Sequence, residues 1–253
     1  MPVSPTIRIG VGGWTFEPWR GVFYPPGLTQ KCELEYAAAH LNTIEINATY
    51  YGRQKPTSFT NWAAAAPDGF KFSVKASRYS MQRKLLAEGG DSVKMFLEQG
   101  FTELGDRLGP ILWQFAATKR FEPDDFARFL ELIPDMQDGV SLRHVLEVRH
   151  ASFVDPSFVA LARARNMAIA FADSDAFPQI DEATADFSYA RLQRAVEACA
   201  TGYDAPALDA WATHAQAWGA RGDAYVFFIS GAKVRNPLAA LALIERLRQA
   251  SPA

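Results

Sequence analysis

Acidic, basic and amide side chains occur at the ends of short apolar segments, with a spacing that sets them side by side. Glu45 and Asn47 are two residues apart in the segment TIEINA, and Glu147 and Arg149 are two apart in VLEVRH. Because successive side chains of a strand point to opposite faces, each pair shares one face. Carboxylates there can exchange protons, and the cations beside them can bind an anion or stabilise developing negative charge.

Other apolar segments end in the same way. Lys75 and Gln114 each close one segment, Asp173 follows a third, and Arg191 and Gln193 share a face near the end of a fourth. Burying an unpaired charge is costly, so these residues need a reason. One reason is a ring of ion pairs that only closes the end of the fold. The other is catalysis, and on that hypothesis the catalytic residues are Glu45, Lys75, Glu147, Arg149, Asp173 and Arg191.

Aromatic residues and a basic loop accompany these positions. The aromatic residues follow the first two segments and are either a stacking wall for a planar or sugar-like ligand or the packing of a lid: Trp14, Phe16, Trp19, Tyr50 and Tyr51. In the loop SGAKVRNPL, a sharp turn at Gly231, two cations and a helix N-terminus form a candidate anion site. The predicted ligand-binding residues are Trp14, Asn47, Tyr51, Gln114, Gln193, Lys233, Arg235 and Asn236.

The elements that position these residues are eight short apolar or β-branched segments, most of them separated by a helical pattern. Each has the length of a strand that is buried on both faces, and alternation with helices implies parallel pairing. The predicted strands are Ile7–Gly12, Thr43–Ala48, Phe70–Ala76, Pro110–Phe115, His144–Arg149, Met167–Ala172, Phe187–Leu192 and Ala224–Ser230.

These strands predict an α/β fold, a single (β/α)8 TIM barrel that spans residues 1–253 as one domain. The length of 253 residues agrees with this, since such barrels have about 250 residues. An open, doubly wound sheet would show the same alternation. The first strand is not followed by a GxGxxG turn, which favours the closed barrel. The polar side chains at the strand ends would then meet at one mouth.

Capping residues predict where several helices begin. Asp155-Pro156 and Asn236-Pro237 have the order of an N-cap followed by a proline in the first turn. Pro123 is expected to open a helix that ends near Ile133, and Asp204 to cap one that stops at Gly222. Between Ala172 and Phe187 there is room only for a short, irregular helix.

Composition argues against some classes of partner. The formal net charge is −2, so no bulk positive field attracts nucleic acid or an anionic membrane. No apolar run approaches the ~20 residues of a membrane span, and the start of the chain lacks the pattern of a signal peptide. The two cysteines, Cys32 and Cys199, are expected to be free thiols. These features predict a cytoplasmic protein, and they do not indicate its oligomeric state.

Along nearly its full length the chain resembles the YecE-like family, also called domain of unknown function 72. The motifs that carry the resemblance are IGVGGWTFEPWRGVFYP (9–25), TIEINATYY (43–51), FKFSVKA (70–76), LWQF (112–115), LEVRHASF (146–153), YARLQ (189–193) and YVFFISGAKVRNPLAAL (225–241). The resemblance implies a (β/α)8 barrel and no established reaction. It also implies a shared set of polar mouth residues: Trp14, Glu45, Asn47, Tyr51, Lys75, Gln114, Glu147, Arg149, Asp173, Arg191 and Asn236.

The chain departs from the family pattern at four places. Ala116-Ala117 replaces a Pro-Pro, Gln193-Arg194 replaces a His-Gly, Ile229-Ser230 replaces an Asn-Asn, and Tyr79-Ser80 stands where the family has a Thr-His. Two potential bases or ligands are thereby lost. Either the substrate has changed in this branch, or those groups are not essential.

Three functional hypotheses follow. The leading one is an enzyme of hydrolase or lyase type that acts on a small polar, anionic ligand, with Glu45 and Glu147 as acid and base. The second is a phosphoesterase that holds Mg²⁺ between Glu45, Glu147 and Asp173. A zinc site is disfavoured, because only His150 of the four histidines falls near the mouth. The third is a non-catalytic ligand-binding barrel. The leading hypothesis requires neither a metal nor a cofactor.

Overall fold

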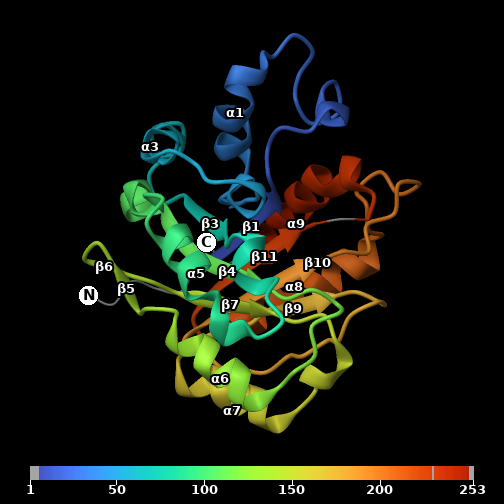
Figure 1. The fold of residues 1–253 in the computed structure, drawn as a ribbon. Helices are drawn as coiled ribbons and strands as arrows, with labels where there is room; N and C mark the ends of the chain where they lie inside the picture. The colour runs from blue at the N-terminus through green and yellow to red at the C-terminus, as the bar shows by residue number, and fades with distance from the viewer. Residues whose placement is uncertain (1–5, 230, 251–253) are drawn as a thin grey trace.

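The computed structural model describes residues 6–229 and 231–250, which form a barrel of parallel strands with helices outside it (Figure 1). The strands are β1 (Ile7–Gly12), β2 (Thr43–Ile46), β3 (Lys71–Lys75), β4 (Leu108–Gln114), β7 (His144–Glu147), β8 (Ala168–Ile169), β9 (Phe171–Asp173), β10 (Phe187–Leu192) and β11 (Asp223–Phe228). Their order in the sheet is β8-β7-β4-β3-β2-β1-β11-β10-β9. Two further strands, β5 (Met136–Gln137) and β6 (Val140–Ser141), form a separate antiparallel hairpin.

The first and last members of this sheet are two halves of one segment, and this closes the barrel. β8 pairs with β7, while β9, which begins two residues after β8 ends, pairs with β10 on the other side. Between them, the Ala170 amide donates to the Leu146 carbonyl at 3.0 Å, so the segment stays attached to β7. Counted this way, the described residues form the eight-stranded barrel that the sequence predicts.

Helices follow most of the strands and cover the outside of the barrel (Figure 1). The longer ones are α1 (Glu33–His40), α3 (Pro56–Ala64), α5 (Gly90–Leu97), α6 (Pro123–Glu131), α7 (Pro156–Ala164), α8 (Ala205–Gly219) and α9 (Asn236–Ala250). Short helical turns complete the connections: α2 (Ala48–Tyr51), α4 (Arg78–Met81), η1 (Glu17–Trp19), η2 (Gln30–Cys32), η3 (Leu86–Gly89), η4 (Phe101–Arg107), η5 (Ala151–Phe153) and η6 (Lys233–Arg235). Residues 174–186, between β9 and β10, contain no helix. In the part of the chain that the structure describes, no helix is long and apolar enough to span a membrane.

Most predicted strands are found within one or two residues of their expected ends. The largest differences are at the carboxyl ends, where β2 stops at Ile46 and β7 at Glu147. Asn47 already has helical backbone angles and leads into α2, and Arg149 lies in the loop before η5. The last two residues of each of these predicted strands therefore lie beyond the strand, beside the mouth. Ser230, the last residue of the eighth predicted strand, lies outside the described residues.

The helix starts agree with the capping signals at three of four places. The carboxylate of Asp155 accepts from the Ser157 amide at 2.8 Å, and that of Asp204 accepts from the Ala207 amide at 2.9 Å. Pro123 lies in the first turn of α6. The prediction of an N-cap at Asn236 is wrong, because η6 runs directly into α9 and Asn236 is already in helical conformation.

Two layers of apolar residues flank the strands. The larger lies between the strands and the helices and includes Phe72, Trp113 and Leu146. The smaller one fills the barrel interior and consists of Leu112, Val145, Ala168, Ala170, Phe187, Tyr189, Tyr225 and Phe227. Four aromatic rings from β10 and β11 thus pack beside the small residues of β8 and its continuation. This interior layer forms a solid base below the mouth.

Candidate functional site

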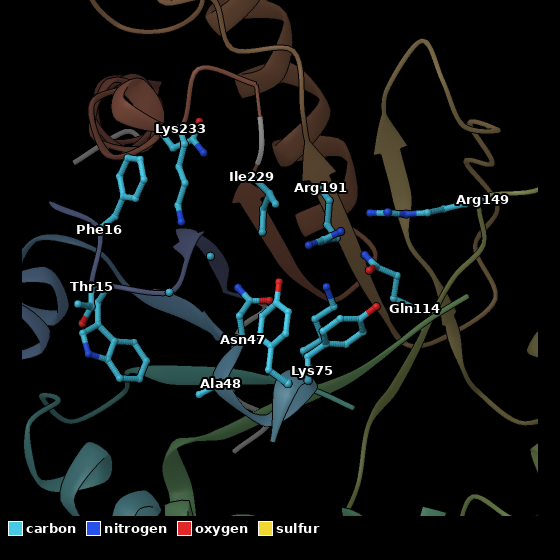
Figure 2. Close-up of a pocket in the computed structure, with 16 residues that line it drawn as sticks. Thr15, Phe16, Asn47, Ala48, Lys75, Gln114, Arg149, Arg191, Ile229 and Lys233 are labelled. Carbon is cyan, nitrogen blue, oxygen red and sulfur yellow. The ribbon is translucent and has the colours of Figure 1, made fainter. Parts of the chain in front are cut away.

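A pocket of about 620 Å³ opens at the carboxyl ends of the strands (Figure 2). Residues from β1, β3, β4 and β10, from α2 and α9, and from the loops and turns that follow the strands line it: Gly12, Gly13, Trp14, Thr15, Phe16, Asn47, Ala48, Tyr50, Tyr51, Lys75, Gln114, Arg149, Arg191, Ile229, Lys233 and Asn236. Its size is within the range of small-molecule sites, about 300–1,000 Å³. The polar strand ends therefore meet at one opening, as the barrel predicts.

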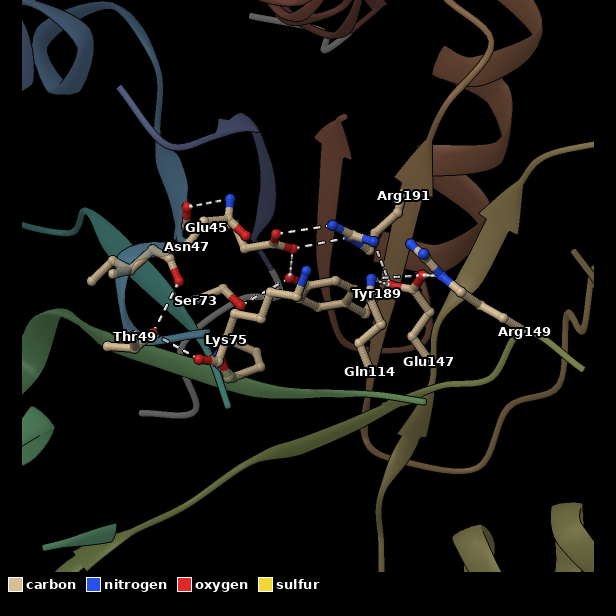
Figure 3. A network of polar contacts seen from close by, with 12 residues as sticks. Glu45, Asn47, Thr49, Ser73, Lys75, Gln114, Glu147, Arg149, Tyr189 and Arg191 are labelled. Carbon is tan, nitrogen blue, oxygen red and sulfur yellow. Dashed lines mark hydrogen bonds and ion pairs between the residues drawn. The ribbon is translucent and has the colours of Figure 1, made fainter. Parts of the chain in front are cut away.

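Arg191, from β10, links the two buried carboxylates in the floor of the pocket (Figure 3). Its Nε and Nη2 donate to the two oxygens of Glu45, each at 3.0 Å, and its Nη1 donates to Oε2 of Glu147. The side chain of Arg191 is only 2% exposed, and those of both glutamates are fully buried. Three charges from three strands are thus held in one hydrogen-bonded group, where pairing offsets much of the desolvation cost.

Each carboxylate has further partners (Figure 3). Gln114 donates to both oxygens of Glu147 at 3.0 Å, and Nε of Arg149 donates to Oε1 at 2.8 Å. The hydroxyl of Tyr189 donates to Oε2 of Glu45 at 2.8 Å and lies 2.8 Å from the Ser73 hydroxyl. The guanidinium and its carboxylates are therefore fixed in place by neutral groups on either side and, at Glu147, also by the cation of Arg149.

The cations around Glu147 determine its protonation. Burial by itself would raise the pKa of this carboxyl, but Arg191, Arg149 and Lys75 together lower it to about 2. The two carboxylates in turn outweigh the effect of burial on Arg191 and raise the pKa of its guanidinium. Glu147 is consequently a permanent carboxylate at neutral pH.

Lys75, at the end of β3, is in a different environment. Its side chain is buried, its Nζ lies 4.1 Å from the ring centre of Tyr50, and it lines the pocket. Among the described residues, no hydrogen bond or ion pair engages this nitrogen. Burial, reinforced by Arg191, lowers the pKa of Lys75 to about 8 despite the nearby glutamates. Lys75 is therefore the pocket residue whose charge changes nearest to neutral pH.

Two more cations stand at the sides of the pocket. In Figure 2, Lys233 and Arg149 appear on opposite sides of the opening. The Nζ of Lys233 lies 4.3 Å from the ring centre of Phe16, and the guanidinium carbon of Arg149 lies 4.4 Å from that of Phe177. Within the described part of the chain, the terminal nitrogens of Arg149 and Lys233 carry no hydrogen bond, so their donors face the opening.

Three predicted site residues do not join this group. Asp173 accepts from the hydroxyl of Tyr203 at 3.2 Å and pairs with Arg194 at 2.5 Å, behind the lining of the pocket. Gln193 is outside the lining, and its backbone N–H donates to the backbone carbonyl of Asp173 at 3.1 Å. Arg235 donates from Nε to the Glu197 carbonyl at 3.0 Å. The other predicted catalytic and ligand-binding residues line the pocket or, like Glu45 and Glu147, form its floor.

The aromatic residues divide between the two roles that the sequence leaves open. Trp14, Phe16, Tyr50 and Tyr51 line the pocket, and Tyr51 is 67% exposed there. Trp19 is completely buried, and its indole donates to the Lys233 carbonyl at 2.8 Å. Trp19 therefore supports the basic loop from below and does not offer a ligand surface.

Two residues of the floor were missed by the sequence reasoning, namely Ser73 and Tyr189. Ser73 is two residues before Lys75, and Tyr189 is two before Arg191. Extending the two-residue alternation backwards along each strand would have placed both on the same inward face.

The arrangement bears directly on metal binding. Within residues 6–229 and 231–250, no group of three or more His, Cys, Asp or Glu side chains is close enough to hold a metal ion. Glu45 and Glu147 surround a guanidinium, while Asp173 is engaged elsewhere by Arg194. The three carboxylates that the magnesium hypothesis requires do not form one site.

A family model described as "Protein of unknown function DUF72" matches residues 8–253. The chain belongs to this family. No curated protein matches it significantly.

Solved structures of DUF72 proteins have the same fold. One from Thermotoga maritima MSB8 is 25% identical, with a TM-score of 0.78 over 96% of this chain and 99% of that one. One from Enterococcus faecalis V583 is 17% identical, with a TM-score of 0.75 over 98% of this chain and 97% of that one. A D-psicose 3-epimerase from Clostridium cellulolyticum H10, 14% identical over 96% of this chain and 98% of its own, has a TM-score of 0.55 and shares the barrel fold alone.

Of the departures from the DUF72 pattern, Ile229 lines the pocket, and the others that the structure describes lie outside its lining. Ala116, Ala117 and Tyr79 are exposed and do not line the opening. Arg194, in the place of a glycine, forms the ion pair with Asp173 and a second one with Asp175 at 3.0 Å. In this DUF72 protein, Arg194 therefore pairs with the carboxylate of Asp173. Ser230 lies outside the described residues.

Proposed function

We propose that this DUF72 protein is an enzyme that binds a small anionic substrate in the mouth of the barrel and carries out acid–base chemistry of hydrolase or lyase type. The observation that carries the proposal is the charge of the pocket. Lys75, Arg149, Arg191 and Lys233 line it, and only Glu45 and Glu147 oppose them. In a concave site with low-dielectric walls, this excess of cations favours an anion.

The unpaired donors at the two sides of the pocket suit the anionic group of a substrate. Arg149 uses Nε for Glu147 and keeps its terminal nitrogens towards the opening. A guanidinium fork of this kind binds carboxylate or phosphate oxygens in pairs. Lys233 would add a second positive charge, and Asn47 and Gln114 would orient the rest of the molecule. Trp14 and Tyr51 offer apolar walls.

Proton transfer falls to Lys75 in this proposal and not to Glu147, the base suggested by the sequence. A general base works best when its pKa is near the working pH. With a pKa of about 2, and already accepting four hydrogen bonds, Glu147 is a poor proton acceptor at neutral pH. The pKa of Lys75, about 8, is close to that requirement, and its nitrogen lies in the pocket.

Anion binding can be tested by thermal unfolding with inorganic phosphate, glycerol 3-phosphate and lactate, each against potassium chloride at equal ionic strength. A ligand that binds the folded state at 100 times its Kd stabilises it by about 2.7 kcal/mol. We expect stabilisation of the wild type and its loss in R149M/K233M. A matched control, K94M/R248M, removes two cations that are 72% and 74% exposed on the outer helices and should bind as the wild type does.

Equal stabilisation of R149M/K233M and wild type would contradict the proposed binding site. Compounds that bind are then incubated with the protein and followed by NMR. Product formation that K75M abolishes supports an enzyme. A ligand that binds at the mouth and is returned unchanged across the panel would favour the non-catalytic barrel instead.

A further inference from the structure

Lys75 is accessible from the pocket, and its nitrogen has no hydrogen-bond or ion-pair partner among residues 6–229 and 231–250. The side chain leaves the end of β3 towards the mouth, beneath Arg191 in the view of Figure 2. The carboxylates close to it are already occupied by the guanidinium groups of Arg191 and Arg149. Its Nζ packs over the face of Tyr50, 4.1 Å from the ring centre, and this contact leaves the nitrogen free to meet a ligand.

Lys71, on the same strand, shows what a structural lysine looks like here. It is four residues earlier, at the opposite end of β3, and its Nζ donates to the Asp106 carbonyl at 2.5 Å. An amine that only supports the barrel is thus held by an acceptor. Lys75 is buried but has no such acceptor among the described residues, although burying an unpaired ammonium is costly. A role as a reactive amine would explain why a lysine occupies this buried position.

We infer that Lys75 is a nucleophile that forms a Schiff base with the carbonyl group of an anionic aldehyde or ketone substrate. This rests on the proposed function, because Arg149 and Lys233 would hold the carboxylate or phosphate of that substrate. The substrate class is therefore a short oxo acid or a phosphorylated aldose or ketose. The covalent intermediate deepens the proposal towards lyase-type chemistry, in which the iminium withdraws electrons from the neighbouring carbon.

The step balances without a further reagent. The ammonium of Lys75 first loses one proton, and the neutral Nζ attacks the carbonyl carbon, forming a C–N bond as the C=O π bond breaks. The released proton and one more from the nitrogen leave with the carbonyl oxygen as water. The product is a protonated imine, which retains the third proton and the positive charge. Arg149 and Lys233 then face the anionic part of the adduct.

The electrostatics of the site favour this step near neutral pH. A pKa of about 8 leaves roughly a tenth of Lys75 as the neutral amine at pH 7, far more than an ordinary lysine provides. The groups that set this value are the burial of the side chain, Arg191 and Arg149, which favour the neutral amine, and Glu45 and Glu147, which oppose them. Tyr50 covers one side of the nitrogen.

Reductive trapping tests the inference. The whole protein is incubated with glyoxylate, pyruvate or dihydroxyacetone phosphate in the presence of sodium cyanoborohydride, which reduces an imine to a stable secondary amine. Intact mass and peptide mapping then locate the adduct. We expect one adduct per chain, on Lys75, with at least one of these probes. The rate should rise with pH to half its maximum near pH 8.

Two variants provide the controls. K75R keeps the charge but should lose the adduct, and K71R, on the same strand at the other end, should keep it. Circular dichroism checks that both are folded, and mapping of the wild type does not depend on either variant. Adducts spread over exposed lysines, an adduct on Lys233, or equal trapping in K75R would overturn the inference.

The same samples separate this inference from the proposed function. Glycerol 3-phosphate and lactate carry an anionic group but no aldehyde or ketone carbonyl group. If they stabilise the protein and none of the three probes is trapped, the Schiff base is wrong while anion binding stands. If a probe is trapped on Lys75 and the two carbonyl-free anions do not bind, the nucleophile stands and the proposed anion site is wrong.

Discussion

At the residue scale, the site is organised around Arg191. One guanidinium binds two carboxylates from β2 and β7, and all three side chains are buried. Such a group is expensive to desolvate, and breaking it by removing one partner costs about 3–5 kcal/mol. Because the charges of Arg191 and the two glutamates neutralise one another, the floor of the pocket is stable and rigid. The cations that remain available to a ligand are Lys75, Arg149 and Lys233.

The pKa of Glu147 predicts how stability depends on pH. The folded state lowers this pKa from 4.5 to about 2, so the folded protein holds the carboxylate ionised more firmly than the unfolded chain does. That contribution is present in full above about pH 4.5 and is lost as the pH falls towards 2. We expect E147Q to lower the free energy of unfolding by about 3 kcal/mol at pH 7. At pH 3, the difference in unfolding free energy between E147Q and wild type should be less than half of the difference at pH 7.

Urea denaturation at pH 7, 5, 4 and 3 measures this difference. E131Q, at an exposed position at the end of α6, is the matched control and should follow the wild type at every pH. A gap between E147Q and wild type that stayed constant from pH 7 to pH 3 would show that the ionised carboxylate is not what stabilises the floor.

At the element scale, small residues on some strands make room for large groups on their neighbours. Ala168 and Ala170 belong to the interior layer that Tyr189 and Phe187 fill from β10. On β1, a Cβ at Gly12 would lie 2.9 Å from the side-chain amide nitrogen (Nδ2) of Asn47, at the edge of the pocket. The glycines of β1 therefore allow close approach of the neighbouring elements.

Gly10 tests this argument. A Cβ there would lie 1.9 Å from the Thr43 carbonyl oxygen of β2, a backbone atom that can move only if the two strands separate. We expect G10A to lower the free energy of unfolding by about 3 kcal/mol or more, or to prevent folding. In G52A, by contrast, the new methyl meets no atom within 4 Å and the backbone is extended, so the change should stay within about 0.5 kcal/mol. Thermal and urea unfolding of both variants give the comparison, and a G10A protein as stable as G52A would contradict it.

At the scale of the whole molecule, neither the charge nor the strand pairing that closes the barrel is evenly distributed. The chain carries a formal net charge of −2, yet its mouth presents four cations to two carboxylates. Anion binding therefore depends on local groups and not on the overall field. The barrel is likewise strongest on one side, since β10 and β11 pair along the whole of Phe187–Leu192. At the segment formed by β8 and β9, pairing is shared between two neighbours and is short with each.

This difference predicts where the barrel opens first. The β8–β9 segment is followed by residues 174–186, which form no helix, so fewer elements hold it than hold β1 or β11. Local opening starts where backbone pairing and packing are least extensive. In hydrogen-exchange mass spectrometry, peptides over Ala168–Asp173 should exchange faster than peptides over β1 and β11. Equal protection around the barrel would contradict this.

The strands, the fold class and most of the mouth could be predicted from the amino-acid sequence. Alternation of apolar and polar residues with a period of two marks both a strand and the side on which Glu45, Glu147 and Arg191 lie. Because parallel strands of a barrel end at one face, the meeting of these side chains follows from the topology. Capping at Asp155 and Asp204 was equally local and was found where expected.

Which charged groups pair with one another could not be predicted before the fold was known. Asp173 has the sequence context of a mouth residue, yet Arg194, 21 positions later, and Tyr203 hold it behind the pocket. Glu147 was expected to act as an acid or base, but cations from β10, from β3 and from the loop after β7 keep it ionised. Those effects depend on distances of a few ångströms between distant segments, which local patterns do not encode. The same packing gives the amine of Lys75 no acceptor in the described part of the chain.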